Sequence, residues 1–541
     1  MTFEDDHSAL NELVGGFSNY HVLLFVMIAF RAVPSGWNEL LVHLVTPKLQ
    51  HWCAPYSGFN QTSWKSYAIP ADPFGGLEQC TQYHLDSFYR YGHFHYPDRY
   101  APRTECRNGR SFEYFVLGNT ATASFDLACE SAWLRELLVT ADALGAIAGF
   151  LIFGRLSDRH GRRKVLLSCA VCTVLFALLD AFSPVYTVFL IGRLFLGAFD
   201  AGIFVSSLVL FIELIPPHLR SYVNVGVGLA FTLPMPILGL LAWLIQDFRY
   251  LHLCLALAYT AFVFVVPLVK ESPRWLISQG YSTEAQESLE AIIKFNGRRP
   301  PNPSRLIEIL EEKRPVPDVS VQSTQTLLLS GILSASALAL STDFLSIHRA
   351  SDPDSTLRHD DPYARYHGYS EFYAGYPKSG YRINSALLWF FICNCFAEVI
   401  GSILGIAANH FFNRRITQWI AVAAAACCFI LCCALLFGKG RYWFLILALF
   451  PRLALHVARY TGILVVTETA PTAKRCSVVG IALACATLVR ALSFGLLALG
   501  ASESGVLPIC AMSIAALAGL VWFSRETKNL PLPDSWEETA E

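Results

Sequence analysis

The sequence predicts an all-α membrane protein with twelve transmembrane helices in two pseudo-symmetric six-helix bundles. Of its 541 residues 54% are hydrophobic and only 15% are charged, whereas soluble proteins carry roughly 25% charged residues. The charges are clustered, and they leave apolar runs of about the 20 residues that a helix needs to cross a bilayer.

Internal repeats support the division into two halves. The segment Glu213-x-x-Pro216-x-x-x-Arg220 recurs 255 residues later as Glu468-x-x-Pro471-x-x-x-Arg475, and Glu271-Ser272-Pro273-Arg274 is followed at the same offset by Glu526-Thr527-Lys528-Asn529. Two homologous membrane halves with a working site where they meet are typical of alternating-access transporters.

The apolar runs define the expected spans. They lie near residues 21–44, 132–153, 165–183, 186–209, 221–244, 250–269, 326–345, 384–408, 417–437, 442–465, 477–499 and 505–523. The expected organisation is an N-terminal segment 1–20, a first bundle 21–269 with a large loop 45–131, an inter-bundle segment 270–325, a second bundle 326–523 with a loop 346–383, and a tail 524–541.

Basic residues in the short loops predict the orientation. Arg155, Arg159, Arg162, Arg163 and Lys164 fill the second-to-third connection, and Arg220, Arg414, Arg415, Lys474 and Arg475 mark three others. Cationic short loops stay in the cytoplasm. We therefore expect a multi-pass plasma-membrane protein with both termini and the 270–325 segment inside the cell, and with the 45–131 loop outside.

The 45–131 loop carries features of an extracellular segment. Its four cysteines are Cys53, Cys80, Cys106 and Cys129, which suit two disulfides in an oxidising compartment, with three pairings open. Asn60-Gln61-Thr62 is an acceptor sequon for glycosylation. The loop is also a candidate surface for homo-oligomer formation.

Other classes of function lack support in the sequence. The net charge of −1 argues against nucleic-acid binding, which favours a basic face. No nucleophile–base pair, metal-ligand cluster or phosphate loop stands out, so we predict no enzyme, cofactor or metal. The histidines of the 346–383 loop, His348, His359 and His367, are interpreted as part of a solvated loop.

One basic segment has the residues of a gate. In Gly154-Arg155-Leu156-Ser157-Asp158-Arg159-His160-Gly161-Arg162-Arg163, Gly154 allows two helices to approach closely, Asp158 can pair with arginines and Gly161 permits a tight turn. Such a charge cluster can hold two bundles together in one state and release them in the other. Glu213, Arg220, Glu468 and Arg475 are its expected partners. The second-half counterpart, residues 409–415, lacks the acid.

This segment resembles the signature of the major facilitator superfamily. Within it, the chain is similar to the organic cation, anion and zwitterion transporters of solute carrier family 22. The similarity rests on Cys106-Arg107-Asn108-Gly109, Phe125-Asp126-Leu127-Ala128-Cys129, Ala132-Trp133-Leu134, residues 271–280 and residues 526–533. It implies a carrier that moves small organic ions across a lipid bilayer by rocking two bundles around a central site.

An ionisable residue inside a bilayer is a functional candidate because burying its charge is costly. Glu398 lies in the predicted eighth helix, and cation transporters of the resembled family tend to have Glu at the matching place. Anion transporters have a lysine four residues after their acid, where this chain has Ser402. One carboxylate without the lysine favours a positively charged substrate group.

The eleventh helix complicates the choice. Where cation carriers have Asp and anion or carnitine carriers have Arg, this chain has Thr487, and Arg490 follows on nearly the same face. Glu398 with Arg490 suits a zwitterion. Asp200, Trp389 and Tyr460 complete the candidate substrate contacts. Alternatives are an organic anion exchanger of the same family and a transport-inactive receptor or scaffold.

Overall fold

The computed structural model describes residues 18–299, with gaps at 48, 71–76, 99, 114–117 and 223–224, then residues 385–436 and 449–498, and Lys528. The predicted spans 326–345 and 505–523, the 346–383 loop and most of the tail lie outside the described residues.

The first bundle is helical, as predicted. Its long helices are α2 (Asn19–Val45), α6 (Trp133–His160), α7 (Arg162–Ala181), α8 (Tyr186–Leu214), α10 (Met235–Ile245) and α11 (Phe248–Val265). Six segments of the described chain are long and apolar enough to cross a membrane, and all six belong to this bundle. Their ends differ from those of the predicted spans by only a few residues, except at the end of α6.

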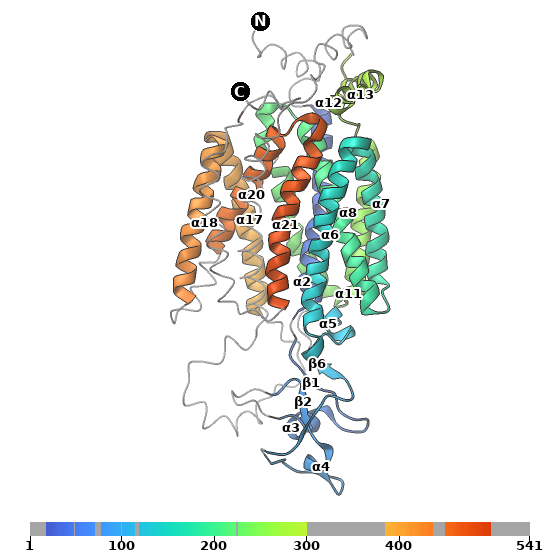
Figure 1. Ribbon diagram of the computed structural model, residues 1–541, viewed down its shortest axis with the longest axis vertical. Coiled ribbons are helices and arrows are strands. Elements are labelled where there is room, and N and C mark those ends of the chain that lie inside the picture. The colour runs from blue at the N-terminus through green and yellow to red at the C-terminus, as the bar shows by residue number, and fades with distance from the viewer. Residues whose placement is uncertain are drawn as a thin grey trace.

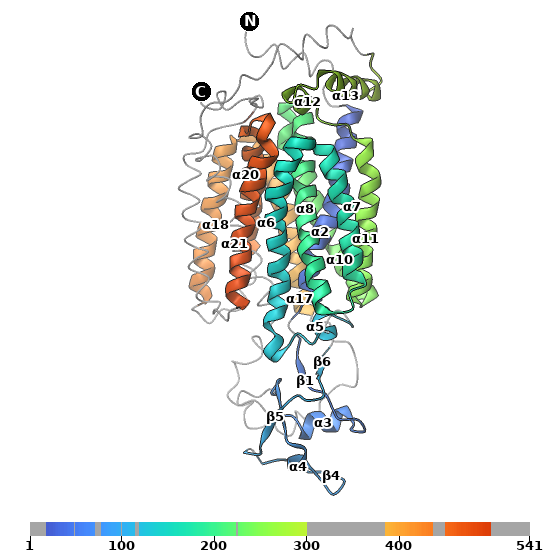
Figure 2. The ribbon, with the colours of Figure 1, turned by 45° about the vertical axis from the view of Figure 1, so that its right-hand side comes forward.

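The second bundle contributes four helices to the described residues. They are α17 (Ser385–Phe411), α18 (Arg414–Leu436), α20 (Leu449–Thr469) and α21 (Arg475–Ala498). In both ribbon views α21 runs beside α6 of the first bundle (Figures 1 and 2), so these two helices form a direct seam between the bundles.

The fifth span is not the single helix that the sequence predicts over residues 221–244. It consists of a 3₁₀ segment η2 (Pro217–Tyr222), a π-helical turn η3 (Val225–Leu229), a short α9 (Ala230–Thr232) and then α10. Pro234, at the start of α10, has no N–H to donate, which favours a break there. Single π turns are frequent at functional sites, and this one lies at the bundle seam.

The predicted connection over residues 154–164 is mostly helical. Helix α6 continues to His160 and α7 begins at Arg162, so Gly161 alone makes the turn. Gly161 has φ +103°, a conformation that glycine adopts without the steric cost of a Cβ atom. The signature segment is therefore rigid: it is the last two turns of one helix and the start of the next.

Residues 49–131 form a separate disulfide-linked subdomain beyond one end of the helices (Figure 1). The disulfides are Cys53–Cys106 and Cys80–Cys129, which confirms the predicted bridges and fixes the pairing. Its elements are β1 (His51–Cys53), α3 (Gln61–Tyr67), β2 (Thr81–Tyr83), α4 (Leu85–Phe88), β3 (Tyr89–Arg90), β4 (His93–Phe94), β5 (Arg103–Glu105), β6 (Arg110–Phe112), α5 (Ala121–Ser124) and η1 (Cys129–Ser131). Strands pair antiparallel as β1–β6, β2–β5 and β3–β4, and the buried Trp64 and Phe88 rings fill a small core.

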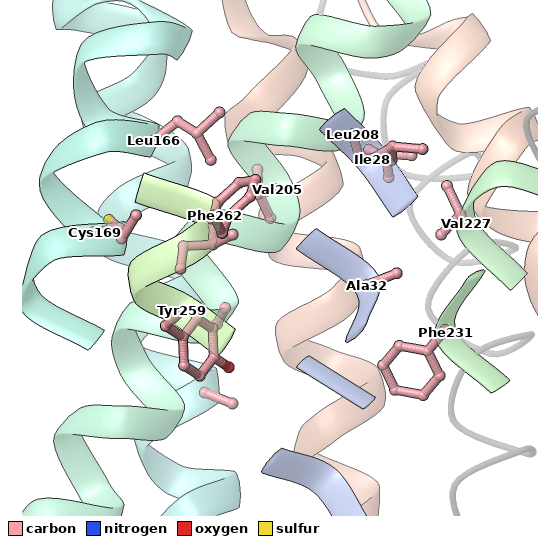
Figure 3. Close-up of a cluster of buried hydrophobic side chains, with 14 of the residues drawn as sticks. Ile28, Ala32, Leu166, Cys169, Val205, Leu208, Val227, Phe231, Tyr259 and Phe262 are labelled. Carbon is pink, nitrogen blue, oxygen red and sulfur yellow. The ribbon is translucent and has the colours of Figure 1, made fainter. Parts of the chain in front are cut away.

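Short helices α12 (Pro273–Ser278) and α13 (Ser282–Phe295) lie at the opposite end of the bundle, after η4 (Val266–Leu268) (Figure 2). The core of the first bundle is apolar, and Figure 3 shows Ile28 and Ala32 of α2 beside Val227 and Phe231 of the fifth span. Helix α2 therefore connects the first-bundle core to the broken span.

Candidate functional site

Asp158, near the end of α6, binds the N-terminus of α21 in the other bundle. One carboxylate oxygen accepts from the backbone N–H of Cys476 (3.1 Å), and the other from the backbone N–H (2.7 Å) and the hydroxyl (2.6 Å) of Ser477. A helix N-terminus carries partial positive charge and unpaired N–H groups, so it favours a carboxylate there. This contact joins the two bundles.

An ion-pair cluster lies next to it. Glu213 of α8 accepts from Arg162 (3.3 Å) and from Arg475 of α21 (2.8 Å), and all three side chains are buried. Arg162 also pairs with Asp158 (3.2 Å) and donates to the carbonyl oxygen of Thr472 in η6 (Thr472–Lys474) at 2.7 Å. Glu213 and Arg162 therefore hold the second bundle through two bonds, one to the Arg475 side chain and one to the Thr472 backbone.

The repeat motif produces a second, mirrored cluster. Glu468 of α20 pairs with Arg414 of its own bundle and lies 3.8 Å from Arg220 of the first bundle. Each glutamate thus has one arginine from its own bundle and one from the other. His410 stands where Asp158 stands in the first half, so this copy lacks the carboxylate that binds a helix N-terminus. We call both clusters, together with Asp158, the clamp.

Glycines allow the bundles to approach each other at the clamp. A Cβ atom on Gly154 would lie 2.8 Å from the carbonyl oxygen of Cys476, and one on Gly480 would lie 2.3 Å from that of Phe150. Real Cβ atoms do not approach so closely. The structure therefore places Gly154 at a close helix contact, as the sequence predicts.

The remaining signature arginines lie outside the clamp. Arg155 and Arg159 are exposed and form no ion pair among the described residues. Arg163 donates its side chain to the carbonyl oxygen of Pro267 (3.0 Å), and its backbone N–H to Glu271 (3.0 Å). Glu271 also accepts from the backbone N–H of Arg162 (3.1 Å), so it caps the start of α7. Burial raises the pKa of Glu271, although these bonds to the carboxylate lower it.

A second group of residues, polar except for Phe204, lies in the middle of helices from both bundles. It consists of four pairs, each four residues apart and therefore on one helix face. The pairs are Arg31 and Ser35 of α2, Asp200 and Phe204 of α8, Glu398 and Ser402 of α17, and His456 and Tyr460 of α20. We call these eight residues the central group.

Glu398 faces the broken fifth span. The hydroxyl oxygen of Thr232 lies 2.9 Å from the carbonyl oxygen of Gly228 and 3.4 Å from a carboxylate oxygen of Glu398. Gly228 is held so close to α17 that a Cβ there would lie 2.9 Å from the hydroxyl oxygen of Ser402. The π turn thus brings first-bundle backbone against the second-bundle carboxylate.

Ser402 and Tyr460 adjoin His456. The hydroxyl oxygen of Ser402 lies 2.7 Å from Nε2 of His456, and the rings of His456 and Tyr460 have centroids 4.7 Å apart. Tyr460 is buried and lies against the π turn, where a Cβ atom on Gly228 would be 3.3 Å from its ring. Ser402, at the position where the resembled anion carriers have lysine, therefore belongs to a hydrogen-bonded pair with His456.

Two of the other predicted substrate contacts form hydrogen bonds within their own bundles. Asp200 accepts at one oxygen from Ser35 (2.6 Å) and Tyr259 (2.8 Å) within the first bundle. Thr487 is half-buried and donates to the carbonyl oxygen of Leu483 (2.8 Å). The side chains of Arg490 and Trp389 lie outside the described residues.

Sequence reasoning did not select Arg31, Ser402 and His456 as site residues, although Arg31 and His456 are charged or titratable groups in predicted spans. The four-residue spacing from Glu398 to Ser402 and from His456 to Tyr460 was a usable signal. No signal in the sequence indicated the contact between α17 and the π turn, because the sequence predicts a regular helix over that span.

Comparisons with known proteins agree with this architecture. A family model described as "Sugar (and other) transporter" matches residues 86–347. The xylose symporter XylE, bound to 6-bromo-6-deoxy-D-glucose, superposes with a TM-score of 0.62 at 17% identity, covering 97% of this chain and 99% of that one. A partially occluded inward-open form of XylE from E. coli gives 0.58 at 16% identity, covering 95% and 100%. These likenesses establish the major facilitator fold.

Curated relatives come from one transporter family. Solute carrier family 22 member 6 of Pseudopleuronectes americanus is 26% identical over 370 residues, 64% of this chain and 66% of the relative. The organic cation transporter-like protein of Drosophila melanogaster is 25% identical over 52% of this chain and 50% of the relative. Organic cation/carnitine transporter 2 of Rattus norvegicus is 26% identical over 57% and 58%. The matched stretches thus span about half to two thirds of these relatives. Fold, family model and relatives show that the chain is similar to transporters of the major facilitator superfamily, and the relatives include members of solute carrier family 22.

Proposed function

We propose that this chain is an alternating-access transporter of small organic cations or zwitterions of the carnitine type. The observation that supports this most is the central group: a carboxylate from one bundle and polar groups from the other lie together between bundles that a breakable clamp joins. A substrate bound at Glu398 would be exposed on one side while the clamp is closed, and on the other after the clamp opens.

The clamp supports the conformational part of this proposal. Its cross-bundle contacts include hydrogen bonds and ion pairs beside a seam where glycines allow a close approach. Such contacts can be exchanged for water when the bundles rotate apart. The structure corresponds to the state that is closed at the clamp end. By the positive-inside argument that end is cytoplasmic, and the disulfide-linked subdomain is extracellular at the plasma membrane.

Charge supports a cationic substrate group. Glu398 is the carboxylate of the central group that belongs to the second bundle, and Ser402 brings no positive charge beside it. In a low-dielectric site, a carboxylate attracts a cation much more strongly than it does in water.

The test is uptake and counterflow in cells that express the full chain, with labelled tetraethylammonium, carnitine and an aromatic carboxylate at two membrane potentials. We expect cation uptake that falls on depolarisation. Glu398→Gln should weaken it about 10- to 100-fold, because a charge-assisted bond contributes roughly 1.5–3 kcal/mol. Glu136→Gln, which removes a carboxylate of α6 paired with Arg135, is the matched control.

An organic anion exchanger is the second candidate, and relatives named organic anion transporter 3 favour it. Carboxylate uptake that survives Glu398→Gln, without cation uptake, would replace our proposal with this one. Absence of accelerated counterflow for all three probes would instead indicate a receptor or scaffold.

Asn60 is proposed as a glycosylation site on the outer face. Its side chain is exposed and accepts from the backbone N–H of Thr62 at the start of α3. A shift in electrophoretic mobility on glycosidase treatment, absent in Asn60→Gln, tests both the modification and the orientation of the subdomain.

A further inference from the structure

Arg31 has an unusual environment for a charged residue. It lies on α2 within a membrane span, its side chain is about 1% exposed, and none of its three guanidinium nitrogens has a hydrogen-bond partner among the described residues. A buried charge that lacks hydrogen bonds costs several kcal/mol. No hydrogen bond within the described residues offsets this cost.

The neighbours of Arg31 do not use its N–H groups. Its Cζ lies 4.7 Å from the centroid of the Phe204 ring, a cation–π contact that leaves the donors unsatisfied. Asp200 lies within Coulombic range but forms no ion pair with Arg31 within 4.0 Å. The bonded oxygen of Asp200 accepts instead from Ser35 and Tyr259.

The position of Arg31 relates it to the central group. Helix α2 packs against the π turn η3 and against α9, while Thr232 of α9 lies 3.4 Å from Glu398 of the second bundle. Arg31 and Glu398 therefore lie on helices that flank the broken fifth span from opposite bundles. A guanidinium presents five N–H donors in a planar fork that matches a carboxylate with two hydrogen bonds.

We propose that Arg31 binds the carboxylate of a zwitterionic substrate whose quaternary ammonium group lies at Glu398. This inference rests on the proposed transport function and names its substrate class. The bound carboxylate satisfies the guanidinium, and the two charges of the substrate bridge the two bundles. A substrate of this kind contacts both halves, whereas a simple quaternary ammonium contacts only the second.

The first arm of the test needs no substitution. In proteoliposomes containing the full chain, counterflow is measured with labelled carnitine, carnitine methyl ester and tetraethylammonium. We expect the half-saturation concentration of the ester to be at least about 10-fold higher than that of carnitine, because the ester cannot accept the charge-assisted pair of bonds. Equal values for carnitine and its ester would overturn the role of Arg31 and leave the transport function intact.

The second arm uses Arg31→Gln and Arg31→Lys. Arg31→Gln should raise the carnitine half-saturation concentration at least about 10-fold relative to that of tetraethylammonium, and Arg31→Lys should restore part of the difference, because it keeps the charge without the fork. A proportional change for both probes would make Arg31 structural. If the unsubstituted protein moves none of the probes, the proposed function itself fails.

Discussion

Replacing Asp158 with asparagine should open the clamp without unfolding either bundle. Asp158 pairs with Arg162 inside the first bundle, and that contact does not involve the second bundle. Its three bonds to Cys476 and Ser477 exist only when the bundles are closed. The substitution therefore acts mainly on the equilibrium between the two conformations.

The size of the effect follows from these bonds. Asparagine has one acceptor oxygen, so it can keep the contact with either Cys476 or Ser477, and it loses the attraction of a charge for the N-terminus of α21. A charge-assisted hydrogen bond contributes roughly 1.5–3 kcal/mol. A loss of about 2 kcal/mol lowers the ratio of closed to open protein about 30-fold.

Cys476 offers a native reporter, because its thiol is free and fully buried at the seam. Alkylation of Cys476 by a permeant maleimide, followed by site-resolved mass spectrometry, should accelerate about 30-fold in Asp158→Asn. Glu213 contacts Arg475 but makes no bond to Cys476. Glu213→Gln, which weakens the contact with Arg475, should therefore also accelerate the alkylation of Cys476. Labelling of the half-buried Cys254 serves as the control for global unfolding. Unchanged labelling of Cys476 in both variants would refute the clamp.

Three further predictions concern other parts of the molecule. Gly480→Ala should lower uptake at normal surface expression, because its Cβ atom would lie 2.3 Å from a carbonyl oxygen of the other bundle. Gly149→Ala should instead lower surface expression, because its Cβ atom would lie 2.0 Å from the carbonyl oxygen of Ala198 within its own bundle. Identical effects of the two variants in uptake and biotinylation assays would contradict this distinction. Removing either disulfide should destabilise the disulfide-linked subdomain by about 4 kcal/mol, from closed loops of 53 and 49 residues, and limited proteolysis of Cys53→Ser and Cys80→Ser proteins measures it. Burial lowers the pKa of His51 in that subdomain. The unfolded state therefore binds more protons than the folded state, and stability is lost as the pH falls below about 6.5. Protease resistance should decrease from about pH 7.5 to about pH 5.5 in the unsubstituted protein, and should decrease less in His51→Gln.

The repeat motif predicted part of the clamp but not its pairing. The equal spacing from Glu213 to Arg220 and from Glu468 to Arg475 predicted both halves and named the clamp partners. It did not predict that the arginines exchange bundles, so that Arg475 binds Glu213 and Arg220 lies near Glu468. That exchange depends on how the bundles meet, and a linear pattern does not contain it.

In the signature segment too, some features could be predicted from the sequence and others could not. The types of residue at Gly154, Asp158 and Gly161 predicted a close approach, a charge contact and a turn, because each follows from local covalent chemistry. The selection of Arg162 over Arg155 and Arg159, and the binding of Asp158 to the N-terminus of α21, required the three-dimensional arrangement.

By itself the sequence determined the membrane environment, the two-half architecture and the oxidised loop, because hydrophobic run length, repeat spacing and cysteine position act locally along the chain. Tertiary structure decided the disulfide pairing, the break in the fifth span and the central group, in which the helices of Arg31 and Glu398 flank the broken span from two bundles. These features join residues hundreds of positions apart. Their energies depend on distance and burial between helices, and the order of residues in the chain does not specify either quantity.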